Sequence, residues 1–316
     1  MNLLVNYVAQ PRRSSPLNLA VARVIVCFYA AWKVATYPFS GLRDLPESLF
    51  LSNPLAPQNN FLALPGDLLR WLPWEQATIV VCLSLVAIGW RTGFSACVAA
   101  LLLAHLSGLN YLIVNEKTFL LTVYFLVLYG IYRAEDPLRL DSLRTPRRPP
   151  PSSGRTKDYP MSALRLFLIV FSLIYFFAGV AKWKGGGMSL AWADADNLRL
   201  ILQHNALYHL HETPRAAAWL LRQDGLLAAA GLTTLLLEFG FFLAVLARAP
   251  IAPFVLGLCG MHLAIVATMH LNYFTDMAVF HALFLPWDDL AARCAPGRRL
   301  LARIQRPAVT SAVEVS

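Results

Sequence analysis

The sequence contains little charge for its length and few cysteines. Only 14% of its 316 residues are charged, whereas soluble domains carry about 25%. Hydrophobic residues make up 57% of the chain and the mean hydropathy is +0.53, so a lipid bilayer is the expected environment. The five cysteines form no C-x-x-C motif. A disulfide framework, a zinc ribbon and a dithiol redox site are therefore disfavoured.

Long apolar runs predict an integral membrane protein that crosses the bilayer several times. Five runs are long enough to cross a hydrocarbon core about 30 Å thick, and they cover residues 17–37, 93–114, 161–182, 226–247 and 251–270. Three shorter or interrupted runs are interpreted as further spans, with tilted, re-entrant or interfacial segments as alternatives, at residues 76–90, 118–132 and 271–287. The expected fold is an all-α bundle of about eight transmembrane helices, within a range of about six to nine.

Basic residues gather in two segments that predict the orientation of the chain. Residues 133–160 hold seven Lys or Arg around a Pro- and Ser-rich stretch, and residues 289–316 hold five Arg. Both segments are expected in the cytoplasm, because positively charged loops are retained inside. The orientation also accounts for the net charge of +9 without a nucleic-acid partner. We therefore predict a protein of the plasma (inner) membrane with both termini in the cytoplasm.

The same signals divide the sequence into two halves of one membrane domain. Residues 1–132 and 161–288 each contain four expected spans, joined by the basic linker 133–160 and followed by the basic tail 289–316. Two long loops, 38–75 and 183–225, are then extracytoplasmic and can form one outer cap. The second loop is rich in Trp and His, which suits a position at the lipid interface.

Ionisable residues inside the predicted spans are the main functional candidates, because such groups are unfavourable in lipid. Glu238 and His262 lie about ten and eleven residues from the inner ends of neighbouring helices, so they are expected to meet near the midplane. Two interpretations remain open for this pair: a structural contact between helices, and proton transfer.

A second level near the outer face is the predicted reaction site. Lys182 and His270 are both expected there, where a quinone from the lipid and a substrate from outside can arrive together. The alternative for Lys182 is snorkelling of its ammonium group to the interface. His204 belongs to a weak H-x4-H-x-H pattern, for which we predict no metal site. Asn115 opens an Asn-Glu-Lys triplet that is typical of a short outer turn.

One segment resembles a known membrane enzyme. Phe176-Phe177-Ala178-Gly179-Val180-Ala181-Lys182-Trp183, followed by Trp192 and His204, resembles the membrane part of vitamin K-dependent gamma-carboxylase. More broadly, residues 17–288 resemble the horizontally transferred transmembrane (HTTM) family, with further similarity at Arg23, Asp136 and Asp141. The resemblance implies that Lys182 is the catalytic base and that Glu238 and His262 assist it. Together with the depth of His270 counted along its helix, it predicts a quinone site lined by Asn115, Trp183, Trp192, His204 and His270.

The sequence also departs from the carboxylase pattern. Glu116 follows Asn115 where the carboxylase has His, and five extra residues, including Gly185, Gly186 and Gly187, separate Lys182 from Trp192. After about residue 288 only a short basic tail follows, without the large lumenal part of the carboxylase. Carboxylation of a peptide is therefore not expected to follow from the resemblance alone.

The predicted function is that of a quinol-dependent, carboxylase-like oxygenase or lyase at the outer membrane face. Its expected co-substrate is reduced menaquinone or vitamin K hydroquinone, and a secreted or membrane peptide is a candidate partner. A non-catalytic membrane factor for maturation or export of such a peptide is the first alternative. The second alternative is a small transporter in which Glu238, His262 and His281 form the proton path.

Overall fold

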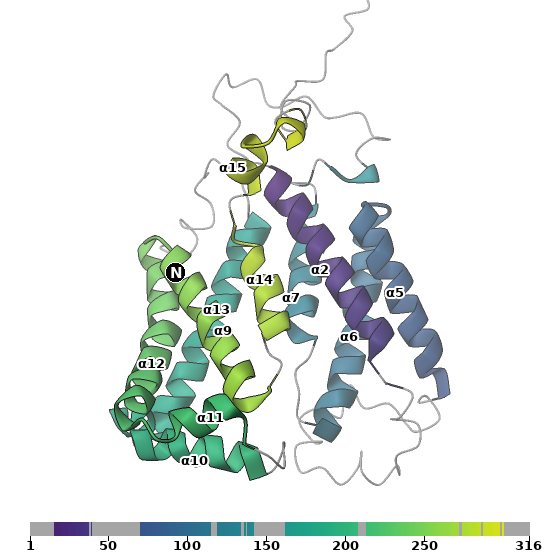
Figure 1. The fold of residues 1–316 in the computed structure, drawn as a ribbon. Helices are drawn as coiled ribbons and strands as arrows, with labels where there is room; N and C mark the ends of the chain where they lie inside the picture. Colours follow the sequence, from purple (N-terminus) through teal and green to yellow (C-terminus); the bar gives the residue numbers. More distant parts are fainter. Residues whose placement is uncertain are drawn as a thin grey trace, which may run out of the picture. The chain divides into compact units, whose positions relative to one another are not determined.

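A computed structural model describes the protein over most of its apolar segments. The described residues are 16–37, 39, 70–114, 119–133, 136, 138–141, 162–207, 213–271, 274–285, 287–297 and 299. All regular secondary structure within these ranges is helical (Figure 1). The chain separates into two compact units: unit 1 comprises Met1–Phe167 and Leu285–Ser316, and unit 2 comprises Leu168–Phe284.

Five helices are long and apolar enough to cross a membrane. They are α2 (Pro16–Thr36), α6 (Thr92–Val114), α9 (Ser162–Gly185), α12 (Asp224–Ala247) and α13 (Ala252–Met269). These helices coincide with the five long apolar runs, so the prediction of an all-helical fold with several helices able to cross a membrane is confirmed for the described residues. The shorter runs correspond to α5 (Leu72–Ile88), α7 (Leu120–Tyr132) and α14 (Phe274–Ala282). The total number of crossings and the orientation stay predictions.

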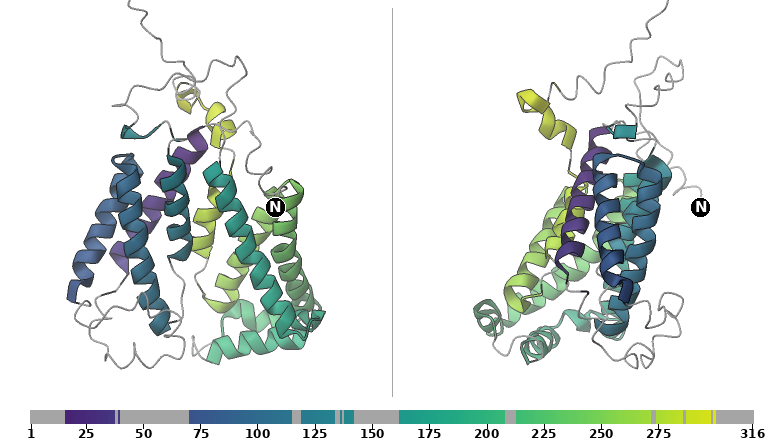
Figure 2. Two further views of the ribbon diagram at one scale, coloured as in Figure 1. Left: turned by 180° about the vertical axis from the view of Figure 1, so that it is seen from behind. Right: turned by 90° about the vertical axis from the view of Figure 1, so that its right-hand side faces the viewer.

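Unit 1 is built on the contacts of α2, α5, α6 and α7. Helix α5 packs against both α2 and α6, α6 packs against α7, and the short α15 (Trp287–Ala292) packs against α2 (Figure 2). Apolar side chains from these helices form the core, and Val26, Leu83, Leu103 and Leu126 are completely buried there. In a bilayer these side chains stabilise the unit through close packing between the helices, because lipid tails are as apolar as the core itself.

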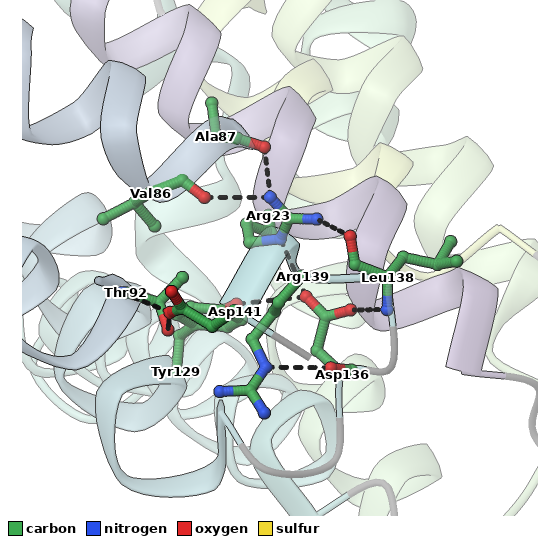
Figure 3. A network of polar contacts seen from close by, with 9 residues as sticks. All are labelled: Arg23, Val86, Ala87, Thr92, Tyr129, Asp136, Leu138, Arg139 and Asp141. Atoms are coloured by element: carbon green, nitrogen blue, oxygen red, sulfur yellow. Dashed lines mark hydrogen bonds and ion pairs between the residues drawn. The ribbon is translucent and has the colours of Figure 1, made fainter. Parts of the chain in front are cut away.

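Arg23 lies in the middle of α2, yet it is only 3% exposed (Figure 3). Its Nε donates to Asp136 Oδ2 at 2.7 Å, and its Nη2 donates to the carbonyl oxygen of Leu138 at 3.3 Å. Its Nη1 donates to the carbonyl oxygens of Val86, at 2.9 Å, and Ala87. These two carbonyls belong to the last turn of α5, where the regular intrahelical hydrogen bonds end and carbonyl oxygens can accept from other groups. Arg23 therefore ties α2 to the end of α5 and to the segment that follows α7.

Asp136 is 0% exposed and has several partners besides Arg23. The hydroxyl of Tyr129 donates to Oδ2 at 3.0 Å, and the backbone N–H of Leu138 donates to Oδ1 at 3.0 Å. Nε of Arg139 donates to the backbone carbonyl of Asp136 at 2.9 Å. A buried charge is tolerated when it is paired and hydrogen-bonded in this way.

Asp141 caps the beginning of α6. Its carboxylate accepts the backbone N–H group of Arg91 at 2.9 Å. It also accepts the backbone N–H group of Thr92 at 3.1 Å (Figure 3). Burial raises the pKa of Asp141, but these two N–H donors, Arg139 and the Thr92 hydroxyl act in the opposite direction, and the net pKa is lowered from 3.8. The charged form is therefore favoured at the helix N-terminus, as expected for a cap.

Replacement of this cap should make the stability less dependent on pH. Because the pKa of Asp141 is lower in the folded state, its contribution is present above 3.8 and is lost as the pH falls through the folded value. Asp141→Asn should therefore be less stable than wild type at pH 7, by about 0.3–1 kcal/mol. Thermal unfolding in detergent should show this difference shrinking at pH 3. An equal difference at both pH values would contradict the assignment.

Unit 2 combines long helices with a layer of short ones. Helix α12 packs against α13, and α13 packs against α14. Helices α10 (Ala195–Asn205) and α11 (Arg215–Leu220) run crosswise at one end of α12 and α13 (Figure 1). The 3-10 helix η4 (Leu190–Ala193) packs on α12 at Gly231, where a Cβ atom would lie only 2.8 Å from Ala193 Cα. We call η4, α10 and α11 the cap of unit 2.

Candidate functional site

One face of α9 carries the residues that organise the candidate site. Phe171, Tyr175, Gly179 and Lys182 follow one another at spacings of four, four and three residues, which places them on the same side of a helix. The Phe171 ring packs against Phe241 of α12, with ring centroids 6.2 Å apart. The later positions on this face contact polar residues of α12 and α13.

Lys182 and Glu238 form an ion pair at the cap end of this face. Lys182 Nζ donates to Glu238 Oε1 at 2.5 Å. The Glu238 residue is 3% exposed, and the Lys182 side chain is 25% exposed. Gly179 makes the pair possible, because a Cβ atom there would lie 3.3 Å from both Glu238 Cβ and the ring of Phe239. The small residue allows α12 to approach α9 one turn away from Lys182.

Trp192 covers the other side of the lysine. Lys182 Nζ lies 5.4 Å from the centroid of the Trp192 ring, within range of a cation–π interaction. A tight turn brings the tryptophan back: Gly187 has φ +68°, and the N–H of Met188 donates to the carbonyl of Trp183 at 3.0 Å. At Gly186 a Cβ atom would lie 2.6 Å from the backbone nitrogen of Trp192.

Two histidines lie around Tyr175. The Tyr175 hydroxyl and His262 Nε2 share a buried hydrogen bond of 2.9 Å. The His281 ring centroid lies 5.9 Å from that of Tyr175, and His281 Nδ1 lies 2.7 Å from the carbonyl oxygen of Met277. A carbonyl oxygen can only accept, so Nδ1 carries the hydrogen and Nε2 of a neutral His281 is an acceptor.

Tyr175, Lys182, Glu238, His262 and His281 form what we call the polar layer of unit 2. Glu238 lies nine residues before the end of α12 and His262 ten residues after the start of α13, so both are about 14–15 Å from those ends. Among the described residues, three buried atoms of the layer have no hydrogen-bond partner: Glu238 Oε2, His262 Nδ1 and His281 Nε2. Since unpaired buried polar atoms are unfavourable, they mark a place suited to water or a polar ligand.

Four phenylalanine rings pack together next to the polar layer. Phe171 lies one turn before Tyr175 on α9 and contacts Phe241, Phe280 and Phe284, with ring centroids 5.8–6.2 Å apart. Phe171, Phe241 and Phe280 are buried. We call these four rings the aromatic floor. Their side chains have no proton to exchange.

The contacts differ from those expected from the sequence. The expected pairing of Glu238 with His262 is wrong, because Glu238 pairs with Lys182 and His262 pairs with Tyr175. The sequence analysis grouped Lys182 with His270, whereas in the structure the ammonium group of Lys182 lies beside Glu238. His270 is exposed and ends α13 with φ +53°. No contact between Lys182 and His270 is present in the described part of unit 2.

The other predicted site residues are dispersed. Trp183 is 38% exposed, and His204 is exposed in the last turn of α10. Asn115 lies outside the described residues. Within the described ranges, no three His, Cys, Asp or Glu side chains are grouped as a metal would require.

Tyr175 was missed by the sequence analysis, although its spacing from Lys182 carries a signal. The two residues are seven positions apart, which is two helical turns, with Gly179 between them. A tyrosine in an apolar run nevertheless has the composition of an ordinary core residue. Its hydrogen bond to His262 depends on the packing of α13, which the sequence does not reveal.

Comparisons of the chain with models of known protein families, with characterised proteins and with solved structures found no match. The fold and the site together define an all-helical protein suited to a bilayer, with a buried lysine–glutamate pair beside a tyrosine and two histidines. Membership of the HTTM family stays a prediction.

Proposed function

We propose that the protein is a quinol-dependent membrane enzyme of the HTTM type in which Lys182 is the base. The observation that carries the proposal is the 2.5 Å contact between Lys182 Nζ and Glu238 Oε1 inside an apolar helix face. A proton can shift along this contact, which converts ammonium and carboxylate into amine and carboxylic acid. In the second state Lys182 has a free electron pair and can accept the proton of a phenolic hydroxyl group.

The surroundings of the pair support a hydroquinone as the proton donor. Trp192 offers an aromatic face, and Glu238 Oε2, His262 Nδ1 and His281 Nε2 offer free hydrogen-bonding positions. The charges of Lys182 and Glu238 cancel, so the site favours a neutral ligand. Reduced menaquinone and vitamin K hydroquinone are neutral aromatic diols that dissolve in the bilayer, and both fit these requirements.

The resemblance to the carboxylase supplies the reaction that we propose. One oxygen atom of O2 is transferred to the quinol ring as an epoxide, and the other leaves as water with the two hydrogens of the quinol. We place the reaction in the plasma (inner) membrane, with the cap on the outer side and both termini in the cytoplasm. The positive linker and tail support this orientation.

The test measures epoxide formation by the purified full-length protein in nanodiscs. Reduced menaquinone or vitamin K is supplied with oxygen, and the epoxide is quantified by mass spectrometry. Lys182→Arg should lower kcat by about 100-fold or more, because a guanidinium stays protonated and cannot serve as a neutral base. Lys184→Arg is the matched control: it lies in the same helical turn, is exposed, and should keep wild-type activity.

Two results would contradict the proposal. Unchanged epoxide formation in Lys182→Arg would remove the lysine from the base position. Absence of epoxide with wild-type protein, under conditions in which the carboxylase forms it, would reject the quinol reaction. A search for a partner peptide would then test the non-catalytic alternative.

A further inference from the structure

The proposed role of Lys182 as a base requires another group that can take up its proton. Lys182 can act as a base only after it has lost the proton that its ammonium group holds in the ion pair with Glu238. The Tyr175–His262 hydrogen bond and the bare Nε2 of His281 are not needed for the ion pair itself. Burial of ionisable groups in a membrane helix bundle is unfavourable, so these groups are candidates for a functional role.

We propose that Tyr175 and His262 take up the proton from the Lys182–Glu238 pair and thereby return Lys182 to its amine form, with His281 as a second acceptor. This inference rests on the proposed function. Its basis is the hydrogen bond of 2.9 Å between Tyr175 and His262, together with the buried and unpartnered Glu238 Oε2 of the neighbouring helix α12. The Glu238 carboxylate is also within electrostatic range of the Tyr175 hydroxyl.

Gly179 allows Glu238 to lie between Lys182 and Tyr175 along α9. Glu238 Cβ lies against Gly179, which is three residues from Lys182 and four residues from Tyr175 on the same face of α9. One carboxylate oxygen bonds Lys182, and the other has no protein partner. A single water molecule held by Glu238 Oε2 can extend the hydrogen bonds toward Tyr175.

The transfer balances as a sequence of proton shifts. The Lys182 ammonium gives a proton to the Glu238 carboxylate, and rotation about Cγ–Cδ exchanges the two oxygens. The carboxylic acid passes a proton through the bridging water to Tyr175 Oη, while Tyr175 gives its own hydrogen to His262 Nε2. The products are a neutral lysine, a Glu238 carboxylate, an unchanged tyrosine and a His262 imidazolium. No electrons move.

The aromatic floor lies beside this relay. The rings of Phe171, Phe241, Phe280 and Phe284 carry no exchangeable proton, and the Phe171 ring also packs against His281, with ring centroids 5.0 Å apart. Four titratable groups of the packed helices lie around Tyr175: Glu238 and Cys259, which interact electrostatically with its hydroxyl group, and His262 and His281, whose ring centroids lie 5.9 Å from that of Tyr175. Lys182 lies two helical turns further along α9.

The experiment compares Tyr175→Phe with wild type in two measurements. The variant removes only the hydroxyl group and keeps the ring that packs against Phe171 and Phe241. The first measurement is the pH profile of epoxide formation, where kcat should fall about 10–100-fold with little change in KM. Tyr124→Phe, an exposed tyrosine of α7, is the control and should behave as wild type.

The second measurement does not need turnover. Nitrogen-15 NMR of labelled histidines follows the titration of His262 in nanodiscs without quinol, with His262→Gln used to assign the signal. Glu238→Gln should move the titration midpoint of His262 when Tyr175 is present. In the Tyr175→Phe background the same replacement should have little effect.

The two measurements separate failure of this inference from failure of the proposed function. If Glu238→Gln leaves the titration midpoint of His262 unchanged, the relay is rejected, whatever the activity. Full kcat in Tyr175→Phe would overturn it as well. Coupling between Glu238 and His262 through Tyr175, in a protein that forms no epoxide, would support the relay and reject only the quinol reaction.

Discussion

Asp136→Ala should destabilise the protein by about 3–5 kcal/mol, because it leaves the charge of Arg23 buried without its counterion. Arg23 is 3% exposed and Asp136 is 0% exposed, so water cannot replace the lost carboxylate without opening unit 1. The replacement also removes the acceptor of the Tyr129 hydroxyl. Chemical unfolding in mixed micelles, followed by circular dichroism, measures the change in the free energy of unfolding.

The double variant Arg23→Leu with Asp136→Leu distinguishes an unpaired charge from a general packing defect. It removes both charges, so it should recover part of the stability that Asp136→Ala loses. Full recovery is not expected, since Arg23 also serves the carbonyls of Val86 and Ala87. A loss below about 1 kcal/mol for Asp136→Ala, the size typical of an exposed ion pair, would show that the network is not needed for stability.

The long helices could be predicted from the sequence, whereas this network could not. A backbone in lipid must satisfy its own hydrogen bonds within a helix, and the thickness of the bilayer sets the length of that helix. Both requirements can be recognised in an apolar run without knowing which helices pack around it. Arg23 was visible as a charge inside a run, but its partner lies 113 positions away. Asp136 follows the end of α7 in a segment without periodic apolar residues. Only the packing of α2, α5 and α7 brings the two charges together.

The position of Lys182 shows a second limit of counting residues along helices. Residue counting placed Lys182 by its Cα, near the end of its run. Long side chains on a helix point back toward the N-terminus, so the ammonium of Lys182 lies about one turn deeper than its backbone. That direction brings it beside Gly179 and within reach of Glu238. Counting also predicted that Glu238 and His262 meet, whereas Glu238 bonds Lys182 and His262 bonds Tyr175.

The structure also gives the glycines after Lys182 a role that the sequence comparison did not predict. In the sequence they lengthen the separation between Lys182 and Trp192. In the structure Gly186 and Gly187 form the turn that returns Trp192 to the lysine, with ring and ammonium 5.4 Å apart. The extra residues therefore allow a contact between Lys182 and Trp192, because glycine tolerates positive φ and close backbone approach.

Lys182→Met should destabilise unit 2 by about 3–5 kcal/mol, and more than Glu238→Leu does. The asymmetry follows from exposure: Glu238 is 3% exposed and would remain as a buried carboxylate, whereas the Lys182 side chain is 25% exposed and can turn its ammonium toward water. The free energies of unfolding of both single variants are measured in mixed micelles at pH 7.

The double variant Lys182→Met with Glu238→Leu completes the cycle. With both charges replaced by apolar groups of similar size, it should be within about 1–2 kcal/mol of wild type, so the two single losses should not add. Additive losses would mean that the two side chains do not act as a pair. Recovered stability in a variant without the proposed base would separate the two roles of the pair: apolar packing can restore stability, but the proton acceptance that we propose requires the lysine.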